Sequence, residues 1–317
     1  MRQNCRMDLD SSARSEASFR IRLSHCPSWA IRSHGWVHLE PFRHQGQSYL
    51  YAFRRSSTNV VVRFTPTRRS ELEVTILAPD NPPKKLVQEV ETTLAYMFRA
   101  DEDFRDFWRK CESIEEMQPC ADLRLGALLR SATIFEDAVK TLCTTNCHWR
   151  NTKRMVKRLC ENFGESVETK WGQFWTFPEP DRLASATLEE LAETGIGFRA
   201  EYLSGFAKQV AEGLDVEKWV GRRNDPSLFE EIRSIRGFGE YSTRHILVMA
   251  GDYSRVPFDS DVISYLGISP ALRPSKVRDL IDQRYKSWQG IPFLGYKFER
   301  IMKRRNYVND IQPGHDD

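Results

Sequence analysis

Two carboxylates stand close together near the end of the chain, at Asp259 and Asp261 of the stretch RVPFDSDV. The preceding Val256-Pro257 pair favours an extended backbone, and Asp259 then occupies the position at which a helix would be capped. A carboxylate at a helix N-terminus is exposed, and the helix dipole favours its ionised form. Such a group can stabilise positive charge that develops in a transition state. A plain helix cap explains Asp259 as well, and the two roles are compatible.

A glycine-containing turn precedes these carboxylates. The stretch SLFEEIRSIRGFGEYSTRHILVMAG predicts a helix, a tight turn at Gly237 and Gly239, and a second helix. Both glycines are expected to adopt positive φ and to leave backbone N–H groups uncovered. The second helix would point its own unpaired N–H groups into the same space, which favours a phosphate. The pattern indicates a clamp for a DNA backbone, although an ordinary turn between two helices would also contain such glycines.

The elements that position these residues fall into two regions. Residues 17–80 contain short β-branched and aromatic runs separated by polar turns, which predict antiparallel strands. These runs are FRIRLS, WVHLEPF, SYLYAFR, NVVVRFT and LEVTILA. From Pro83 onward the apolar spacing becomes helical. We therefore expect a flexible tail over 1–16, a sheet domain with flanking helices over 17–115, and a helical body over 116–317.

Composition limits the possible cofactors and partners. The net charge is +3, so any affinity for nucleic acid must come from local clusters of charge. No apolar run reaches the ~18–20 residues needed to cross a bilayer. The seven cysteines are scattered, which favours a reducing compartment, and none follows Cys160, which excludes a C-terminal four-cysteine iron–sulfur cluster. Cys143 and Cys147 are better explained as packing thiols than as zinc ligands.

Several separated motifs, taken in order, resemble those of the helix-hairpin-helix DNA glycosylase superfamily. IRGFGEY and VPFDSDV match its Leu-Pro-Gly-x-Gly turn and Pro-x-Asp segment, with Arg236 in place of the proline. Three stretches resemble 8-oxoguanine DNA glycosylases: LLRSATIFEDAVKTLCTTNCHWRNTKRMVKRLCENFG, FWTFPEPDRLASATLEELAETGIGFRAEYLSGFAKQV and WQGIPFLGYKFERIMK. The strand-rich N-terminal region is similar to the small sheet domain of that group and of 3-methyladenine DNA glycosylase II. The resemblance implies an α+β fold in which this antiparallel sheet packs on an all-α body.

The resemblance also implies roles for individual residues. The family's catalytic aspartate falls on Asp259, which would stabilise charge on the sugar and orient a water molecule while the N-glycosidic bond breaks. Gly237 and Gly239 would contact the DNA backbone. Asn146 and Phe198 would fill the gap that a flipped nucleotide leaves in the duplex.

Two further sites are implied by position. Arg199 takes the place of an arginine that faces the base opposite the lesion. The backbone carbonyls of Arg233, Ile235 and Phe238 take the place of those that hold a monovalent cation in the family. No other cofactor is expected.

The sequence departs from the family at positions that decide the chemistry. Bifunctional members carry a Schiff-base lysine where this chain has Tyr241, which cannot form an imine, and Lys297 is the alternative amine on the expected last helix. The glutamine that reads 8-oxoguanine falls on Phe298. Tyr241, His245, Phe298 and Trp288 are expected to line an aromatic pocket suited to a cationic alkylated purine. Core packing would equally explain these aromatic residues.

We therefore expect a monofunctional DNA glycosylase that flips out and excises a damaged base, in the first instance an alkylated purine, in base excision repair. An oxidised-purine glycosylase and a non-catalytic helix-hairpin-helix DNA-binding protein are the alternatives. The expected partner is double-stranded DNA containing a damaged base, with no membrane and no second subunit. The expected location is the nucleoid in a bacterial cytoplasm or the nucleus of a eukaryote.

Overall fold

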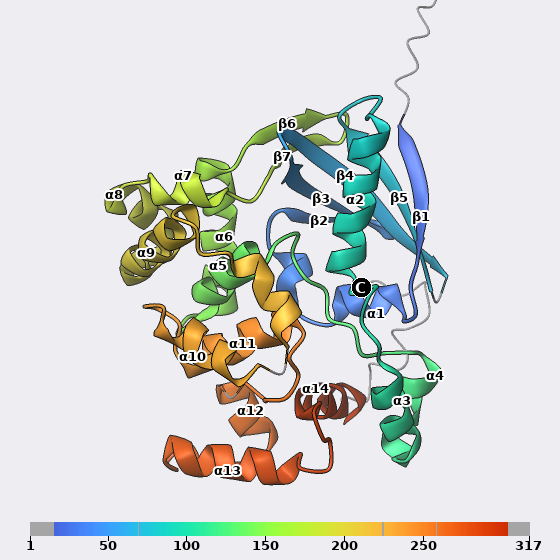
Figure 1. Cartoon of the computed structure of the whole chain (residues 1–317), viewed down its shortest axis with the longest axis vertical. Helices are drawn as coiled ribbons and strands as arrows, with labels where there is room; N and C mark the ends of the chain where they lie inside the picture. The colour runs from blue at the N-terminus through green and yellow to red at the C-terminus, as the bar shows by residue number, and fades with distance from the viewer. Residues whose placement is uncertain (1–15, 69, 224, 258, 304–317) are drawn as a thin grey trace, which may run out of the picture.

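Five antiparallel strands form the N-terminal sheet (Figure 1). The computed structural model of the chain describes residues 16–68, 70–223, 225–257 and 259–303. The strands lie in the order β1-β5-β4-β3-β2. They are β1 (Ala17–Arg22), β2 (Phe42–Gln45), β3 (Ser48–Arg55), β4 (Thr58–Arg68) and β5 (Glu71–Ala78). The expected N-terminal sheet is thereby confirmed, whereas the expected tail, except for Glu16, lies outside the described residues.

The two faces of the sheet pack on different partners, because successive side chains of a strand point to opposite sides. On β4, Val62 and Phe64 belong to the main hydrophobic core, which helix α2 (Lys84–Met97) covers. Val61 faces the other side and contributes to a small separate cluster. That cluster is closed by Phe174 of a hairpin that the sequence did not predict, formed by β6 (Ser166–Thr169) and β7 (Gly172–Trp175).

One predicted strand is wrong. The stretch WVHLEPF begins with a 3-10 helix, η1 (Gly35–His38), that follows α1 (Pro27–Arg32), and β2 starts only at Phe42. The side chain of His34 caps η1 by accepting the N–H of Trp36 at 3.2 Å. Trp36 is then buried, and its indole N–H donates to Asp137 at 2.5 Å. This tertiary contact outweighs the local strand propensity of the segment.

The rest of the chain is helical, as expected. The helices are α3 (Arg105–Glu112), η2 (Glu115–Met117), α4 (Gln118–Asp122), α5 (Ile134–Thr144), α6 (Trp149–Phe163), α7 (Pro180–Ala184), α8 (Leu188–Leu191), a π-helical turn η3 (Ala192–Ile196), η4 (Gly197–Arg199), α9 (Ala200–Ala211), η5 (Val216–Arg222), α10 (Pro226–Ser234), α11 (Glu240–Ala250), α12 (Ser260–Tyr265), α13 (Pro274–Arg284) and α14 (Pro292–Lys303). Within the described part of the chain, no helix combines the length and the hydrophobicity that a membrane crossing requires.

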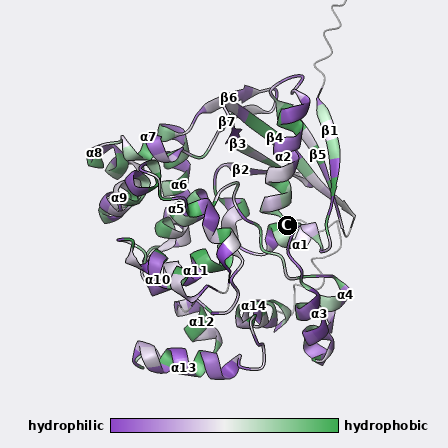
Figure 2. Cartoon of the chain, in the orientation of Figure 1, coloured by the Kyte–Doolittle hydropathy of each residue, from purple (hydrophilic) through white to green (hydrophobic). Residues whose placement is uncertain are grey.

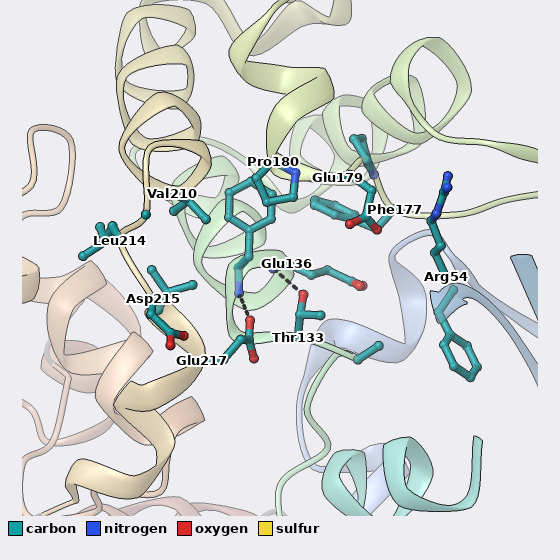
Figure 3. Close-up of a pocket in the computed structure, with 16 residues that line it drawn as sticks. Arg54, Thr133, Glu136, Phe177, Glu179, Pro180, Val210, Leu214, Asp215 and Glu217 are labelled. Atoms are coloured by element: carbon teal, nitrogen blue, oxygen red, sulfur yellow. Dashed lines mark hydrogen bonds between the residues drawn. The ribbon is translucent and has the colours of Figure 1, made fainter. Parts of the chain in front are cut away.

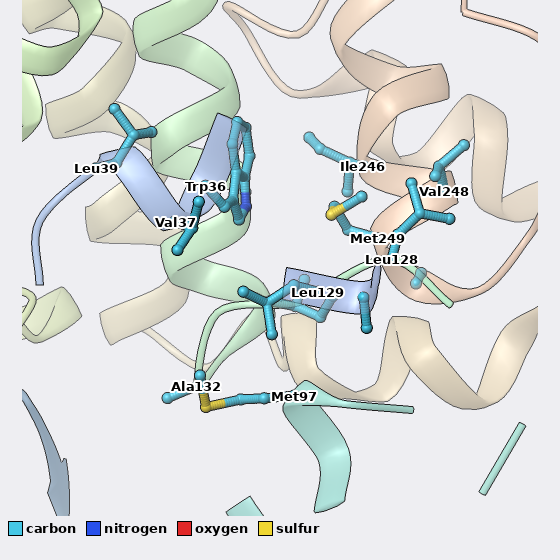
Figure 4. Close-up of a cluster of buried hydrophobic side chains, with 14 of the residues drawn as sticks. Trp36, Val37, Leu39, Met97, Leu128, Leu129, Ala132, Ile246, Val248 and Met249 are labelled. Carbon is cyan, nitrogen blue, oxygen red and sulfur yellow. The ribbon is translucent and has the colours of Figure 1, made fainter. Parts of the chain in front are cut away.

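A continuous hydrophobic core joins the sheet region to the helical body. Figure 4 shows Trp36 and Val37 of η1 together with Met97 of α2, Leu129, and Met249 of α11. All five are less than a tenth exposed. Figure 2 shows hydrophobic residues along the strands, whereas hydrophilic residues are frequent on the outer helices α3 and α13. The core therefore crosses the expected domain boundary, and the two regions hold each other in place.

Buried charges fix the C-terminal end of α11 within this core. Arg99 donates to the carbonyl of Val248 at 2.9 Å, and Arg130 donates to that of Met249 at 2.6 Å. Both guanidinium groups also bind Glu102, at 2.7 and 2.6 Å. The cations lie at the negative end of the helix dipole, and Glu102 compensates part of their charge. The end of α11, from which the chain continues toward Asp259, is thus held from the sheet side.

Candidate active site

The glycine turn links α10 to α11, and its two glycines play different parts. Gly237 has φ +104°, and a Cβ there would lie 2.7 Å from the Cβ of Tyr202. Gly239 has φ −77° and ψ −175°, so the expected positive φ at Gly239 is wrong. It is the N-cap of α11, where an extended backbone is usual. No atom lies within 4 Å of the place a Gly239 Cβ would occupy, so this side of the turn is open.

The start of α11 can bind an anion through its backbone. Its N-cap is a glycine, and within the described residues no side chain caps it. The hydroxyl of Ser242 donates to the carbonyl of Gly239 at 3.0 Å instead of binding an N–H group. The first N–H groups of the helix therefore face the open side of the turn, where the helix dipole favours a phosphate.

Asp259 caps α12, as the sequence predicted. Its Oδ1 accepts the N–H of Val262 at 2.9 Å, and the side chain is half-buried. Burial raises the pKa of Asp259 from its usual value, while the Val262 N–H opposes that rise and the nearby Asp261 adds to it. The sequence predicted that the helix N-terminus favours the ionised form of Asp259. In the structure, burial opposes that effect and is the larger influence on the pKa. Asp261 accepts from Arg300 of α14 at 2.9 Å, and this contact braces α12 against α14.

The segment that carries Asp259 is tied to α11 by an arginine. Arg244 donates to the carbonyl of Val256 at 2.9 Å and to Glu240 at 2.9 Å. The other oxygen of Glu240 accepts from Arg278 of α13 at 2.6 Å. Through Arg244, the carboxylate of Glu240 thus connects the N-terminal end of α11 to the segment before Asp259.

An aromatic group lies beside Asp259. The rings of Tyr241 and His245 stack with their centroids 6.0 Å apart. His245 also lies 5.3 Å from Trp36 and 6.3 Å from His34, both from the sheet domain. Burial, with the charge of Asp259 as the next cause, raises the pKa of Tyr241 to about 12. Sequence reasoning missed both residues: Trp36 was interpreted as part of a strand, and no role was predicted for His34.

Two residues predicted for the same pocket lie in another aromatic group. Phe298 packs against Phe107 with ring centroids 5.2 Å apart, and Trp288 packs against the same ring at 5.9 Å. Phe298 is 1 % exposed and Trp288 is 6 % exposed. The structure therefore brings Tyr241 and His245 together, and places Phe298 and Trp288 in the core next to α3.

The residues predicted to fill the gap in the duplex lie on two loops that one arginine connects. Asn146 follows α5, is exposed, and has φ +47°. Phe198 is 64 % exposed. Arg199 is 5 % exposed and donates to the hydroxyl of Thr145 at 3.1 Å, and its guanidinium lies 4.5 Å above the Phe198 ring. Arg199 therefore holds the two loops together in this structure, and its hydrogen bonds are made within the protein.

The predicted cation ligands lie in the turn itself. Ile235 ends α10, and its carbonyl accepts the N–H of Phe238 at 3.1 Å. A carbonyl oxygen has a second lone pair, so this bond does not prevent it from binding a cation. Arg233 lies in the last turn of α10. The cation site stays a prediction.

Three hollows among the described residues lie away from this group. One of about 400 Å³ is formed at the N-terminal end of α5, where Glu217 accepts the N–H groups of Ile134 and Phe135 at 3.0 and 3.2 Å (Figure 3). Tyr241 instead shares a hydrogen bond with Thr144, at the opposite end of α5. Hollows of about 440 and 680 Å³ likewise contain none of the predicted site residues. None of these three hollows therefore reaches the aromatic group.

Comparison with known proteins agrees with this geometry. Residues 139–311, just over half of the chain, match the family described as HhH-GPD superfamily base excision DNA repair protein. A DNA-3-methyladenine glycosylase of Bacillus subtilis (strain 168) is 28% identical over 95 residues, which are 30% of this chain and 31% of that protein. An N-glycosylase/DNA lyase of Saccharomyces cerevisiae is 33% identical over 78 residues, which are 24% of this chain and 21% of that protein. The chain thus matches less than a third of the length of either relative.

A solved structure shares the whole fold. The 3-methyladenine DNA-glycosylase from Archaeoglobus fulgidus superimposes with a TM-score of 0.70 over 90% of this chain and 99% of that one. The two sequences are 18% identical over this alignment. The likeness confirms an antiparallel sheet packed on a helical body.

Proposed function

The chain belongs to the HhH-GPD superfamily of base excision DNA repair proteins, and on that basis we propose that it is a DNA glycosylase that hydrolyses the bond between a damaged purine and its sugar. One observation carries the proposal: Asp259 caps α12 near enough to Tyr241 for its charge to help raise the pKa of the tyrosine, and Tyr241 lies in the first turn of α11, which follows the open glycine turn. This arrangement would place a phosphate-binding backbone and a carboxylate on the same DNA strand.

The reaction would begin with the nucleotide leaving the duplex. Flipping costs a few kcal/mol of stacking and pairing, and Asn146 and Phe198 would recover part of it by filling the gap. The exposed Phe198 ring is suited to that role, because Arg199 holds its loop next to the loop of Asn146. The phosphate beside the flipped nucleotide would bind the N–H groups at the start of α11. A monovalent cation on the carbonyls of Arg233, Ile235 and Phe238 would strengthen this contact.

Asp259 would act in its ionised form. Cleavage of the N-glycosidic bond builds positive charge on the sugar, which a nearby carboxylate stabilises while it orients the attacking water. Because burial raises the pKa of Asp259, excision should fall as the pH is lowered through that pKa. Tyr241 has no amine, so the proposed enzyme leaves an intact abasic site and has no lyase activity.

Two substrate classes are supported by different observations. An alkylated purine agrees with the name of the Bacillus relative and with an aromatic residue at Tyr241. An oxidised purine agrees with the stretches CTTNC and GIGFRAEY, which lie in regions that resemble 8-oxoguanine DNA glycosylases. Both classes are purines that could stack on the aromatic side chains beside Asp259.

The test is a set of duplexes that each carry one lesion. Wild-type protein is incubated with each duplex, the products are heated in alkali to cleave abasic sites, and single-turnover rates are measured. Asp259→Asn should bind the same duplexes with near wild-type affinity and lose excision, because the charge acts mainly in the transition state. If Asp259→Asn excised at the wild-type rate, or wild-type protein excised no lesion, the proposal would be wrong.

A further inference from the structure

Unpaired polar atoms gather where the sheet domain meets α11. The Nε2 atoms of His34 and His245 and the Oδ2 atom of Asp137 are shielded from water and have no hydrogen-bond partner among the described residues. Buried polar atoms are usually paired, so each unpaired one asks for an explanation. Their position beside Tyr241 suggests that the missing partner is a bound base.

The tautomer of His34 is fixed by its role as a helix cap. Its Nδ1 accepts the N–H of Trp36 at 3.2 Å, so this nitrogen carries no proton. In a neutral imidazole the other nitrogen then carries the proton, which makes Nε2–H a hydrogen-bond donor. Burial also lowers the pKa of His34 well below its usual value, in agreement with the neutral form. His245 is likewise neutral near pH 7, because burial lowers its pKa to about 4.

The turn that carries this donor is held from two sides. On the inner side, Asp137 accepts the indole N–H of Trp36 at 2.5 Å and the backbone N–H of Ser131 at 3.0 Å. On the outer side, the ring of Trp149 lies so close to Gly35 that a Cβ there would be 2.6 Å away. The two hydrogen bonds to the buried Asp137 fix the turn, and they position the imidazole of His34 next to His245.

We propose that His34 donates a hydrogen bond from Nε2 to a carbonyl oxygen of the flipped base, while Nε2 of His245 accepts a hydrogen bond from the adjacent ring N–H. The inference rests on the glycosylase function proposed above. Its consequence is a preference, among flipped damaged bases, for an uncharged purine with an N–H next to a carbonyl, as in an oxidised or deaminated purine, over a cationic alkylated adenine that has no carbonyl. The half-buried His245 side chain turns to admit the base, since both Nε2 atoms are shielded in the unliganded chain.

Charge near the pair supports this choice over a cationic alkylated purine. The positive charge of Lys297 contributes to the lowered pKa values of both His34 and His245, so its electrostatic field reaches both rings. A cationic base would be repelled there, whereas an uncharged lactam would not. The negative charge of Asp259 acts at the other end of the group, next to Tyr241, where the sugar would lie.

One substitution can remove the Nε2 donor of His34 and still keep its role as the N-cap of η1. In His34→Asn the side-chain oxygen can still accept the N–H of Trp36, because asparagine is a preferred N-cap, but the Nε2 donor is gone. His38→Asn is the matched control, since His38 is an exposed residue of the same 3-10 helix. Melting temperatures of both variants should equal that of the wild type.

The measurement compares single-turnover excision of 8-oxoguanine and hypoxanthine with that of 3-methyladenine, a cationic purine without a carbonyl group, from otherwise identical duplexes. Wild type and His38→Asn should prefer the two lactams, and His34→Asn should lose about tenfold to a hundredfold on them while keeping its affinity for undamaged duplex. Faster excision of 3-methyladenine than of the lactams by wild type, or equal lactam rates in His34→Asn and wild type, would overturn the inference and leave the glycosylase proposal standing. If wild type excised none of these lesions, both the glycosylase proposal and the inference about His34 and His245 would be refuted.

Discussion

Alanine at Gly237 is expected to destabilise the protein far more than alanine at Gly239, although the two glycines are separated by one residue. Gly237 has φ +104° and its Cβ would lie 2.7 Å from the Cβ of Tyr202. That neighbour is next to the backbone of α9, so it cannot rotate away. Gly239 has an ordinary φ of −77° and open space around its Cβ position.

The magnitudes follow from these two environments. A positive φ costs an L-residue about 1–2 kcal/mol, and an added carbon in a packed place costs about 1–3 kcal/mol. Gly237→Ala should therefore lower the free energy of unfolding by about 3 kcal/mol, which corresponds to a fall in Tm on the order of 5–10 °C. Gly239→Ala should lower the free energy of unfolding by only about 0.5–1 kcal/mol, because alanine is a poorer N-cap residue than glycine.

Thermal melts of the two alanine variants, compared with wild type in one buffer, test the stability argument. The DNA argument needs Gly239→Val, whose larger side chain would cover the N–H groups at the start of α11 without a positive-φ penalty. Its Kd for undamaged duplex at fixed salt should rise, while its Tm stays close to that of Gly239→Ala. Equal melting temperatures for Gly237→Ala and Gly239→Ala would refute the assignment of strain. An unchanged Kd for Gly239→Val would refute the clamp.

Three further outcomes are expected. Borohydride should trap no covalent complex between wild-type protein and lesion DNA, because Tyr241 has no amine; trapping that disappears in Lys297→Ala would instead show a bifunctional enzyme. Arg244→Met, which removes the donor to the Val256 carbonyl, should lower kcat about tenfold with little change in Kd for DNA, and an equal loss in both quantities would contradict a positioning role. Glu102→Gln should lower the free energy of unfolding by about 3–5 kcal/mol in chemical denaturation, since it leaves two buried arginines without their carboxylate, and a wild-type midpoint would contradict that role.

Local spacing was sufficient to predict the part of the site that lies on one short stretch of chain. One continuous stretch, residues 237–259, contains the turn at Gly237, the helix α11 with Tyr241 in its first turn, and the cap at Asp259. Their geometry depends on near neighbours, such as the Val262 N–H that Asp259 accepts. Only the conformation of Gly239 was wrong, because an N-cap and a positive-φ turn residue both favour glycine.

The direction in which a helical side chain points could not be predicted in the same way. Phe298 and Lys297 are neighbours on α14, and consecutive residues of a helix point about 100° apart, so the two side chains face different surroundings. The position of Phe107 on α3 decides that Phe298 faces the core, since its ring lies 5.2 Å from that of Phe298. Such a contact joins residues nearly two hundred positions apart, and nothing in the spacing of either helix encodes it.

The sheet domain contributes a residue, Trp36, to the site itself. The hydrogen bond from Trp36 to Asp137 of α5 shows how this residue is held there. Trp36 belongs to the N-terminal region, yet its indole N–H is bound by Asp137 of α5, and its ring lies 5.3 Å from His245 of α11. Asp137 is fully buried and also accepts the N–H of Ser131, so the tryptophan is anchored to the helical body more firmly than to its own sheet. A helical body separated from residues 17–115 would lose one wall of the aromatic group along with part of its core. The base-binding surface is therefore a property of the junction between the two regions.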